Sequence, residues 1–88
     1  MTCEQLMRSR YTAYVVGDAD HLFRTWHPRT RPHDVTPDPT IRWTGLEIVA
    51  TGQDTVEFIA RWEGVEMREV SRFEQRAGRW VYVDGVVD

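Results

Sequence analysis

The chain has 88 residues, of which 41% are hydrophobic and 28% charged, and these ordinary globular values predict one small folded domain rather than disorder. Its 11 basic residues are all arginines, and with 14 acids they give a net charge of −3 and no basic half, so nucleic-acid binding is not expected. No apolar run approaches the ~20 residues of a membrane span and no secretion signal opens the chain, so we expect a cytoplasmic protein without membrane contact.

The first predicted element is a helix over residues 3–16. Thr2 and Gln5 have the spacing of a capping box at its start, and Gly17 supplies a left-handed stop at its end. An apolar stripe follows the helical period along one face, which is therefore expected to pack on the core. The stripe contains Cys3, Leu6, Met7, Ala13 and Tyr14. A cysteine packed in this stripe is expected to be inert, and a single cysteine excludes a disulfide framework.

A second, shorter helix is predicted over residues 19–26. Asp18 caps its start, and Pro28 ends it because proline disfavours helical geometry at the residue before it. Residues 28–40 then contain all four prolines and show little periodicity. They are expected to form a long loop, which is either functional or an ordered surface crossover.

The rest of the chain, residues 41–84, is predicted to form strands. Apolar and polar side chains alternate with the period of two that is typical of a half-buried sheet. The alternation changes phase at Gly45, where a β-bulge would return the apolar residues to one face. Turn sequences at residues 51–54, 63–64 and 77–78 separate the expected strands. Two helices followed by a four-stranded antiparallel meander indicate an α+β fold, with the helices covering one face of the sheet.

Several strings of the sequence resemble one known family. They are LMRSRYTAYVVGDADHLFRTWHP, IRWTGLEI, TVEFIARW and EVSRFEQRAGRWVYVDG, and they span nearly the whole chain, from Leu6 to Gly85. The sequence is similar to the YchJ-like family, also described as the uncharacterised UPF0225 proteins. The resemblance implies that residues 1–88 form a single NTF2-like (cystatin-like) cone, in which a curved antiparallel sheet wraps the helices around a pocket.

The resemblance also bears on metals and catalysis. Members of the family commonly carry a cysteine-rich, zinc-binding SEC-C motif beside this domain, but here only Cys3 remains, so no metal site is implied for these residues. The family has no settled activity, and therefore no catalytic residue and no cofactor is carried over. We accordingly expect a binding domain rather than an enzyme.

Side chains in and after the second helix offer two further candidate sites. Three histidines lie six residues apart, at His21, His27 and His33. This spacing matches no metal-ligand pattern, so solvated histidines are favoured over a metal site. Trp26 and His27, followed by Arg29 and Arg31, could grip an anionic ligand between aromatic and cationic groups. The favoured alternative is that Trp26 belongs to the core and that both arginines are solvated.

Two charged residues fall on faces that are otherwise apolar. Arg10 lies in the middle of the apolar stripe on the first helix. Glu69 is two residues from Met67 in a predicted strand, so both side chains are expected on the inward face of the sheet. Buried charges need partners, so we expect Arg10 and Glu69 to meet, and replacing Glu69 with alanine to cost about 3–5 kcal/mol. The groups near enough in pattern to satisfy their remaining donors and acceptors are Tyr14, Ser71 and Tyr82. The pair is either a purely structural tie, which we favour, or the polar floor of a pocket.

Two classes of function remain open. The first, which we favour, is a non-catalytic binding or accessory module that contacts another macromolecule or its own copy. The second is a pocket between helix and sheet that binds a small molecule or performs catalysis, and an enclosed polar cavity of roughly 300 Å³ or more would favour it. The candidate residues of such a pocket or buried polar cluster are Arg10, Tyr14, Trp26, His27, Trp43, Glu69, Ser71 and Tyr82.

The polar face of the sheet also carries apolar side chains. They provide much apolar area for a face left in water, which favours a homodimer formed through the sheet. The side chains concerned are Val49, Val70, Val81 and Val83. Light scattering that shows a strict monomer at high micromolar concentration would count against this contact.

Overall fold

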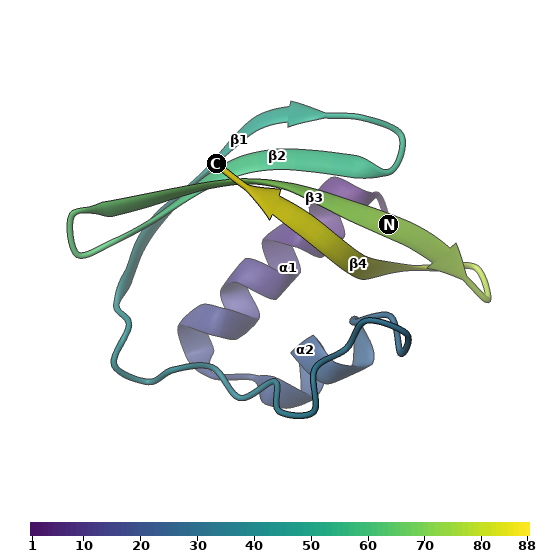
Figure 1. Ribbon diagram of the computed structural model, residues 1–88, viewed down its shortest axis with the longest axis horizontal. Helices are drawn as coiled ribbons and strands as arrows, with labels where there is room; N and C mark the ends of the chain where they lie inside the picture. The colour runs from purple at the N-terminus through teal and green to yellow at the C-terminus, as the bar shows by residue number, and fades with distance from the viewer.

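A curved four-stranded sheet lies over a long helix in the computed structural model, which describes residues 1–88 (Figure 1). The elements are α1 (Cys3–Val16), α2 (Ala19–Arg24), β1 (Trp43–Thr51), β2 (Thr55–Trp62), β3 (Val65–Arg76) and β4 (Arg79–Val87). Neighbouring strands are antiparallel and follow sequence order, so the sheet is a meander. α1 crosses beneath the concave face, whereas α2 packs mainly against α1. The predicted α+β architecture is confirmed.

Local sequence signals set both ends of α1. The Thr2 hydroxyl accepts a hydrogen bond from the Gln5 backbone N–H (3.1 Å), and the Gln5 side chain accepts one from the Thr2 backbone N–H (2.8 Å). The helix ends at Gly17, whose φ of 77° is left-handed and free of strain only for glycine. With 14 residues, α1 is too short to cross a membrane, and α2 is shorter still.

The segment after α2 joins the edge of the sheet. α2 ends at Arg24, two residues before the predicted end at Trp26. The Thr25 carbonyl accepts a hydrogen bond from the Tyr82 N–H, and the Tyr82 carbonyl accepts one from the His27 N–H, both at 2.8 Å. Trp26 therefore forms a parallel bridge with Tyr82 of β4 instead of a last helical turn. Local helix signals cannot reveal this pairing because it depends on a strand far along the chain.

Three register shifts bend the sheet around α1. The first lies between Trp43 and Gly45, close to the bulge predicted from the phase change. The second leaves Val49 unpaired in β1, and the third leaves Val83 unpaired in β4. Bulges increase the local twist and bend of a strand, so the sheet closes over α1 and encloses space beneath it. The core cluster in that space consists of Cys3, Leu6, Met7, Val56, Phe58, Ala60 and Phe73.

The outer face of the sheet exposes only part of the valine patch that the sequence predicts. Val81 and Val83 are buried, because the segment after α2 lies against β4 and the Thr30 hydroxyl donates a hydrogen bond to the Val83 carbonyl (2.6 Å). Val49 and Val70 remain exposed. Ion pairs link the strands on this face: Arg61 with Glu47 and Glu66, Arg68 with Glu57, and Arg72 with Asp84. Two of the four valines that favoured a homodimer are therefore buried, and this part of the prediction is wrong, although Val86, the exposed cross-strand partner of Val70, lies on the same face.

Candidate functional site

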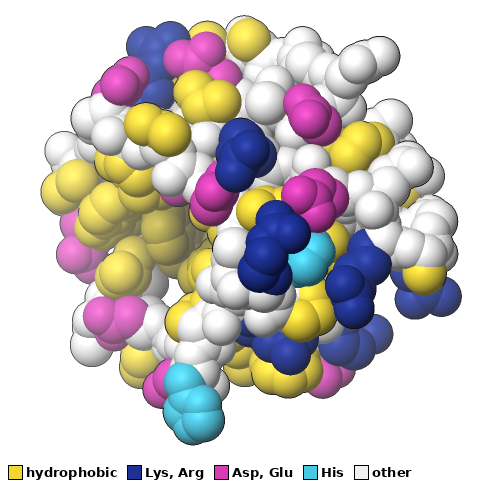
Figure 2. Space-filling model, turned by 45° about the vertical axis from the view of Figure 1, so that its right-hand side comes forward, with side chains coloured by type: hydrophobic (Ala, Val, Ile, Leu, Met, Phe, Trp, Pro, Cys, Tyr) yellow, Lys and Arg dark blue, Asp and Glu magenta, His cyan; other side chains and the backbone are white.

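A cavity of about 350 Å³ lies between α1 and the concave face of the sheet. Ten of its thirteen lining residues are hydrophobic, and Figure 2 shows a hollow walled by such side chains. The lining consists of Met7, Arg10, Tyr11, Tyr14, Trp26, Trp43, Phe58, Ala60, Met67, Glu69, Ser71, Phe73 and Tyr82. A volume of this size falls in the range of small-molecule sites, which combine apolar walls with a few placed polar groups.

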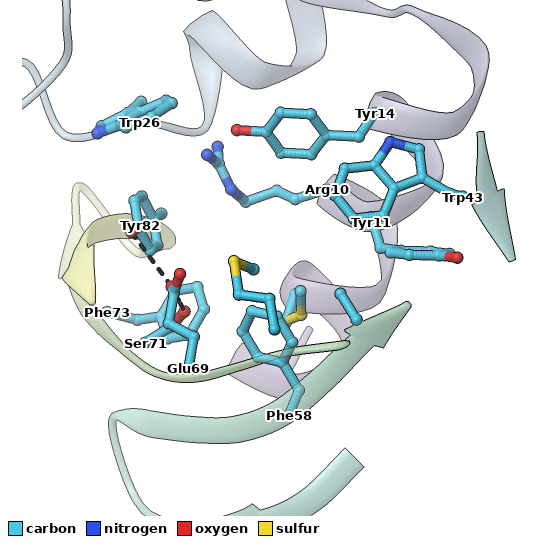
Figure 3. Close-up of a pocket in the computed structure, with 13 residues that line it drawn as sticks. Arg10, Tyr11, Tyr14, Trp26, Trp43, Phe58, Glu69, Ser71, Phe73 and Tyr82 are labelled. Carbon is cyan, nitrogen blue, oxygen red and sulfur yellow. Dashed lines mark hydrogen bonds between the residues drawn. The ribbon is translucent and has the colours of Figure 1, made fainter. Parts of the chain in front are cut away.

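Arg10 projects from α1 into this cavity and is only 4% exposed (Figure 3). Its Nη1 donates hydrogen bonds to the Leu22 carbonyl (3.1 Å) and to the Thr25 hydroxyl (2.7 Å). Its guanidinium carbon lies 4.8 Å from the Trp26 ring centroid and 4.7 Å from that of Tyr82. Burial lowers the pKa of Arg10, but an arginine stays charged, and the two aromatic faces stabilise that charge.

Polar side chains surround the Arg10 guanidinium at this end of the cavity. Its Nη1 donates to the Leu22 carbonyl and the Thr25 hydroxyl, and the Tyr14 hydroxyl is a further hydrogen-bond partner of the guanidinium. The Tyr14 hydroxyl points toward the guanidinium, and burial raises the pKa of Tyr14 against the opposing effect of that cation (Figure 3). The indole N–H of Trp26 is buried without a hydrogen-bond partner. Buried polar groups are nearly always paired, so this indole N–H is an exception, but it lies on the side of the ring away from Arg10 (Figure 3).

Glu69 reaches into the same cavity from β3. Its Oε2 accepts hydrogen bonds from the Ser71 hydroxyl and, at 3.3 Å, from the Tyr82 hydroxyl (Figure 3). Burial, and after it the negative charge of Glu69, raises the pKa of Tyr82. Gly85 makes room for the carboxylate, because a Cβ at that position would collide with it. Oε1 makes no hydrogen bond within the chain, so this end of the cavity offers a free acceptor.

Arg10 and Glu69 do not form the ion pair that the sequence predicts. Both line one cavity, as the helical and strand periods indicate, but each has other partners. The Leu22 carbonyl and the Thr25 hydroxyl hold the guanidinium toward α2, while the Tyr82 ring packs against it and the Tyr82 hydroxyl binds Glu69. The helical and strand periods predict which face a side chain lies on, but they do not predict which atoms its charged group contacts. Because Glu69 is not the partner of Arg10, the large loss of stability that we expected on replacing Glu69 with alanine no longer follows.

Seven of the eight side chains proposed from the sequence line this cavity. They are Arg10, Tyr14, Trp26, Trp43, Glu69, Ser71 and Tyr82. The sequence predictions miss Met7, Tyr11, Phe58, Ala60, Met67 and Phe73. The periodic patterns place these six on the inward faces, but an apolar side chain gives the same signal whether it fills a core or lines a cavity.

His27 is the exception, and it lies outside the cavity. Its Nδ1 accepts a hydrogen bond from the Arg29 backbone N–H (3.0 Å), and its Nε2 lies 3.3 Å from the Glu74 carboxylate. Arg29 also pairs with Glu74 (3.1 Å), and the Arg31 guanidinium stacks 3.6 Å from the centroid of the Phe23 ring. Both arginines thus have partners within the fold. The anion-binding corner considered for this segment is not formed.

Other reactive side chains do not assemble a second site. No group of three or more His, Cys, Asp or Glu side chains is placed to hold a metal ion. The Ser9 hydroxyl lies 2.9 Å from the His21 Nε2, but it donates to the Leu6 carbonyl (2.7 Å). Asp18 accepts from the His21 backbone N–H, so no carboxylate orients the imidazole as a catalytic base would require. Cys3 is buried, and burial raises the pKa of its thiol, as expected of an inert cysteine.

The chain is similar to proteins of one family. Residues 2–85 match the family model described as YchJ, middle NTF2-like domain. A UPF0225 protein of Streptomyces coelicolor is 54% identical over 96% of this chain and 73% of its own length. A UPF0225 protein of Deinococcus radiodurans is 49% identical over 94% of this chain and 68% of its own length. One of Bordetella pertussis is 45% identical over 93% and 69%, respectively. No solved structure matches the chain.

Proposed function

Since the chain belongs to the YchJ-like (UPF0225) family and matches its middle NTF2-like domain, we propose that this domain binds a small, largely apolar molecule in the cavity beneath its sheet. The cavity itself carries the proposal, with about 350 Å³ of space in a chain of 88 residues. The hollow opens on the surface (Figure 2), so its apolar walls face water, and a small domain has little other core with which to offset that exposure. Space retained at that cost is best explained by an occupant.

The aromatic walls of the cavity support the same proposal. On one side, the Trp43 ring meets Tyr11 (5.8 Å between centroids), Tyr14 (6.1 Å) and Trp62 (5.2 Å). On the other side, the Tyr82 ring meets Trp26 at 5.1 Å and Phe73 at 5.9 Å. Rings that pack edge to face hold one another in place. A wall that is ordered before binding lowers the entropy that a ligand loses when it binds.

A surface for a macromolecular partner has less support, although the sequence alone favoured it. Exposed apolar side chains on the outer face are few (Val49, Val70 and Val86), and cross-strand ion pairs satisfy the charges of that face. The net charge of −3 offers no electrostatic attraction to nucleic acid. The binding role is therefore retained, but the partner that we propose is a small molecule.

A cavity-filling variant tests the proposal. Ala60 is 2% exposed and lines the cavity, so Ala60→Leu should occupy part of the space while adding buried apolar surface. Titration with 2-methoxynaphthalene, a neutral probe, should quench the fluorescence of Trp26 and Trp43 in the wild type. The affinity should fall at least tenfold in Ala60→Leu but stay unchanged in Val70→Leu, the matched control on the outer face. Equal binding by both variants, or no binding by the wild type, would contradict the proposal.

A further inference from the structure

The charged and polar side chains of the cavity gather on one side of it. Tyr82 connects the two charges there, because its ring centroid lies 4.7 Å from the guanidinium carbon of Arg10 and its hydroxyl donates to Glu69 (Figure 3). This polar side consists of Arg10, Tyr14, Glu69, Ser71 and Tyr82. The rest of the lining is mainly apolar. A ligand that fills the cavity therefore needs an apolar body and a polar group at one end only.

The two charges together disfavour a charged ligand group. Arg10 is positive and Glu69 is negative, so the polar side has no net charge. An anion placed there would be attracted by Arg10 but repelled by Glu69, and for a cation the signs reverse. Neither ion gains a net attraction that offsets the loss of its hydration, which is large in a mostly apolar cavity. An uncharged polar group loses much less hydration and is therefore favoured.

Glu69 leaves one acceptor open to such a group. Its Oε2 accepts hydrogen bonds from the Ser71 and Tyr82 hydroxyls, whereas Oε1 accepts none from the chain. The indole nitrogen of Trp26 is the only side-chain polar atom that is both fully buried and unpartnered, so Oε1 can be reached from the cavity. A ligand N–H or O–H that donates to Oε1 would complete the hydrogen bonds of this carboxylate.

Tyr14 supplies a donor on the same side. Its hydroxyl is hydrogen-bonded to the Arg10 guanidinium, which can only donate, so the Tyr14 oxygen accepts and its proton remains available. Burial raises the pKa of Tyr14 against the opposing effect of the cation, so the hydroxyl keeps this proton at neutral pH. The neighbouring positive charge also strengthens the O–H as a donor. A ligand carbonyl oxygen is a suitable acceptor for it.

We infer that the cavity binds an uncharged molecule whose apolar body ends in an amide group. The amide N–H donates to Oε1 of Glu69, the amide carbonyl accepts from the Tyr14 hydroxyl, and the apolar body lies against the aromatic walls. An amide fits because its donor and its acceptor are separate atoms side by side, as Tyr14 of α1 and Glu69 of β3 require. The inference rests on the proposed function, because it names the chemical class of ligand for that same cavity.

Four naphthalene probes of similar size test this in calorimetric titrations of the wild type at neutral pH. The amide 2-naphthamide both donates and accepts, and it should bind most tightly. Methyl 2-naphthoate accepts but cannot donate, so it should bind about 10- to 100-fold less tightly, the range expected for a hydrogen bond to a charged group. The anion 2-naphthoate and the cation 2-naphthylmethylammonium should each bind about tenfold less tightly than the amide or weaker still, because each meets one like charge.

Glu69→Gln should invert the order of the amide and the acid. Glutamine keeps a carbonyl oxygen for the Ser71 and Tyr82 hydroxyls but presents an N–H group in place of Oε1. In this variant 2-naphthoate should bind more tightly than 2-naphthamide, because a repulsion has become a hydrogen bond. Glu66→Gln is the matched control in the same strand, where Glu66 pairs with Arg61 on the outer face, and it should keep the wild-type order.

Tyr14→Phe tests the second contact. The amide and the ester each carry a carbonyl oxygen, so both should bind more weakly while the ratio of their affinities stays the same. The affinity for 2-methoxynaphthalene, which has no carbonyl, should change little. If either variant does not fold, the wild-type order of the four probes decides the question.

The outcomes distinguish the inference from the function on which it rests. If the ester or either ion binds the wild type as tightly as the amide, or if Glu69→Gln keeps the wild-type order, the inference is overturned while the cavity remains a binding site. If neither these four probes nor 2-methoxynaphthalene binds the wild type, both the inference and the proposed function fail.

Discussion

Replacing Arg10 with methionine should lower the free energy of unfolding by about 2–4 kcal/mol. The Leu22 carbonyl would lose its charged donor at a buried site, and a buried acceptor left without a partner costs about 1–3 kcal/mol. The contacts of the guanidinium with Trp26 and Tyr82 would add about 2 kcal/mol. Methionine fits an apolar cavity and removes a cation that is costly to desolvate, which offsets part of the loss.

Replacing Glu69 with methionine should cost less, about 1–2 kcal/mol, because the change leaves one buried group, the Ser71 hydroxyl, without its acceptor. Arg10 keeps both hydrogen bonds in this variant. Both residues contact Tyr82 but not each other, so their coupling free energy should be about 0.5–1 kcal/mol, the low end of the range for neighbouring residues. A buried ion pair would instead give a single-residue loss of about 3–5 kcal/mol and strong coupling.

Urea denaturation of the wild type, both single variants and the double variant, followed by tryptophan fluorescence, measures this cycle. Arg76→Met serves as the matched control, because Arg76 is exposed and its replacement should change the unfolding free energy by less than about 0.5 kcal/mol. A coupling of about 3 kcal/mol or more would mean that Arg10 and Glu69 pair in solution. An Arg10→Met protein as stable as the wild type would refute the role assigned to the hydrogen bonds of Arg10.

Three further outcomes follow from local features. Gly17→Ala should destabilise the domain by about 1 kcal/mol in thermal unfolding, because alanine is strained at a φ of 77°. Arg72 lowers the pKa of Asp84, so the stability from this pair is present at neutral pH and is lost as the pH falls through that lowered pKa. Urea titrations between about pH 5 and pH 2 should therefore show a shallower loss for Asp84→Asn than for the wild type. The Cys3 thiol should react with a thiol reagent such as dithionitrobenzoate only when the protein unfolds, and rapid reaction in native buffer would contradict its burial.

The parts of the fold that were predictable from the sequence are those set by neighbouring residues. The capping box at Thr2 and the glycine at position 17 define α1 because each acts within one helical turn. The turns at residues 63–64 and 77–78 place positive φ values at Glu63 (48°) and Ala77 (51°), each followed by a glycine. Each turn needs two residues with positive φ, and glycine adopts such a φ without strain at the second of them. The glycine in the sequence therefore predicts the turn.

The parts that were not predictable depend on contacts between distant residues. Trp26 leaves helical geometry to pair with Tyr82, and no residue near it marks that choice. The bulge at Val83 lacks the glycine that marked the one near Gly45, and strict alternation therefore misjudged the exposure of Val81 and Val83. The same limit applies to the site. Periodicity placed Arg10 and Glu69 in one layer, but the atoms that each would contact depended on three-dimensional packing.

The segment directly after α2 also protects the sheet from association. Unpaired strand edges can template the pairing of another chain and so lead to aggregation. At the β4 edge, the backbone groups of Tyr82 are already bonded to Thr25 and His27. At the β1 edge, register shifts near Gly45 and at Val49 twist the strand away from flat pairing. The domain can therefore keep an open apolar hollow beneath its sheet while part of the β4 edge is paired and the β1 edge is irregular.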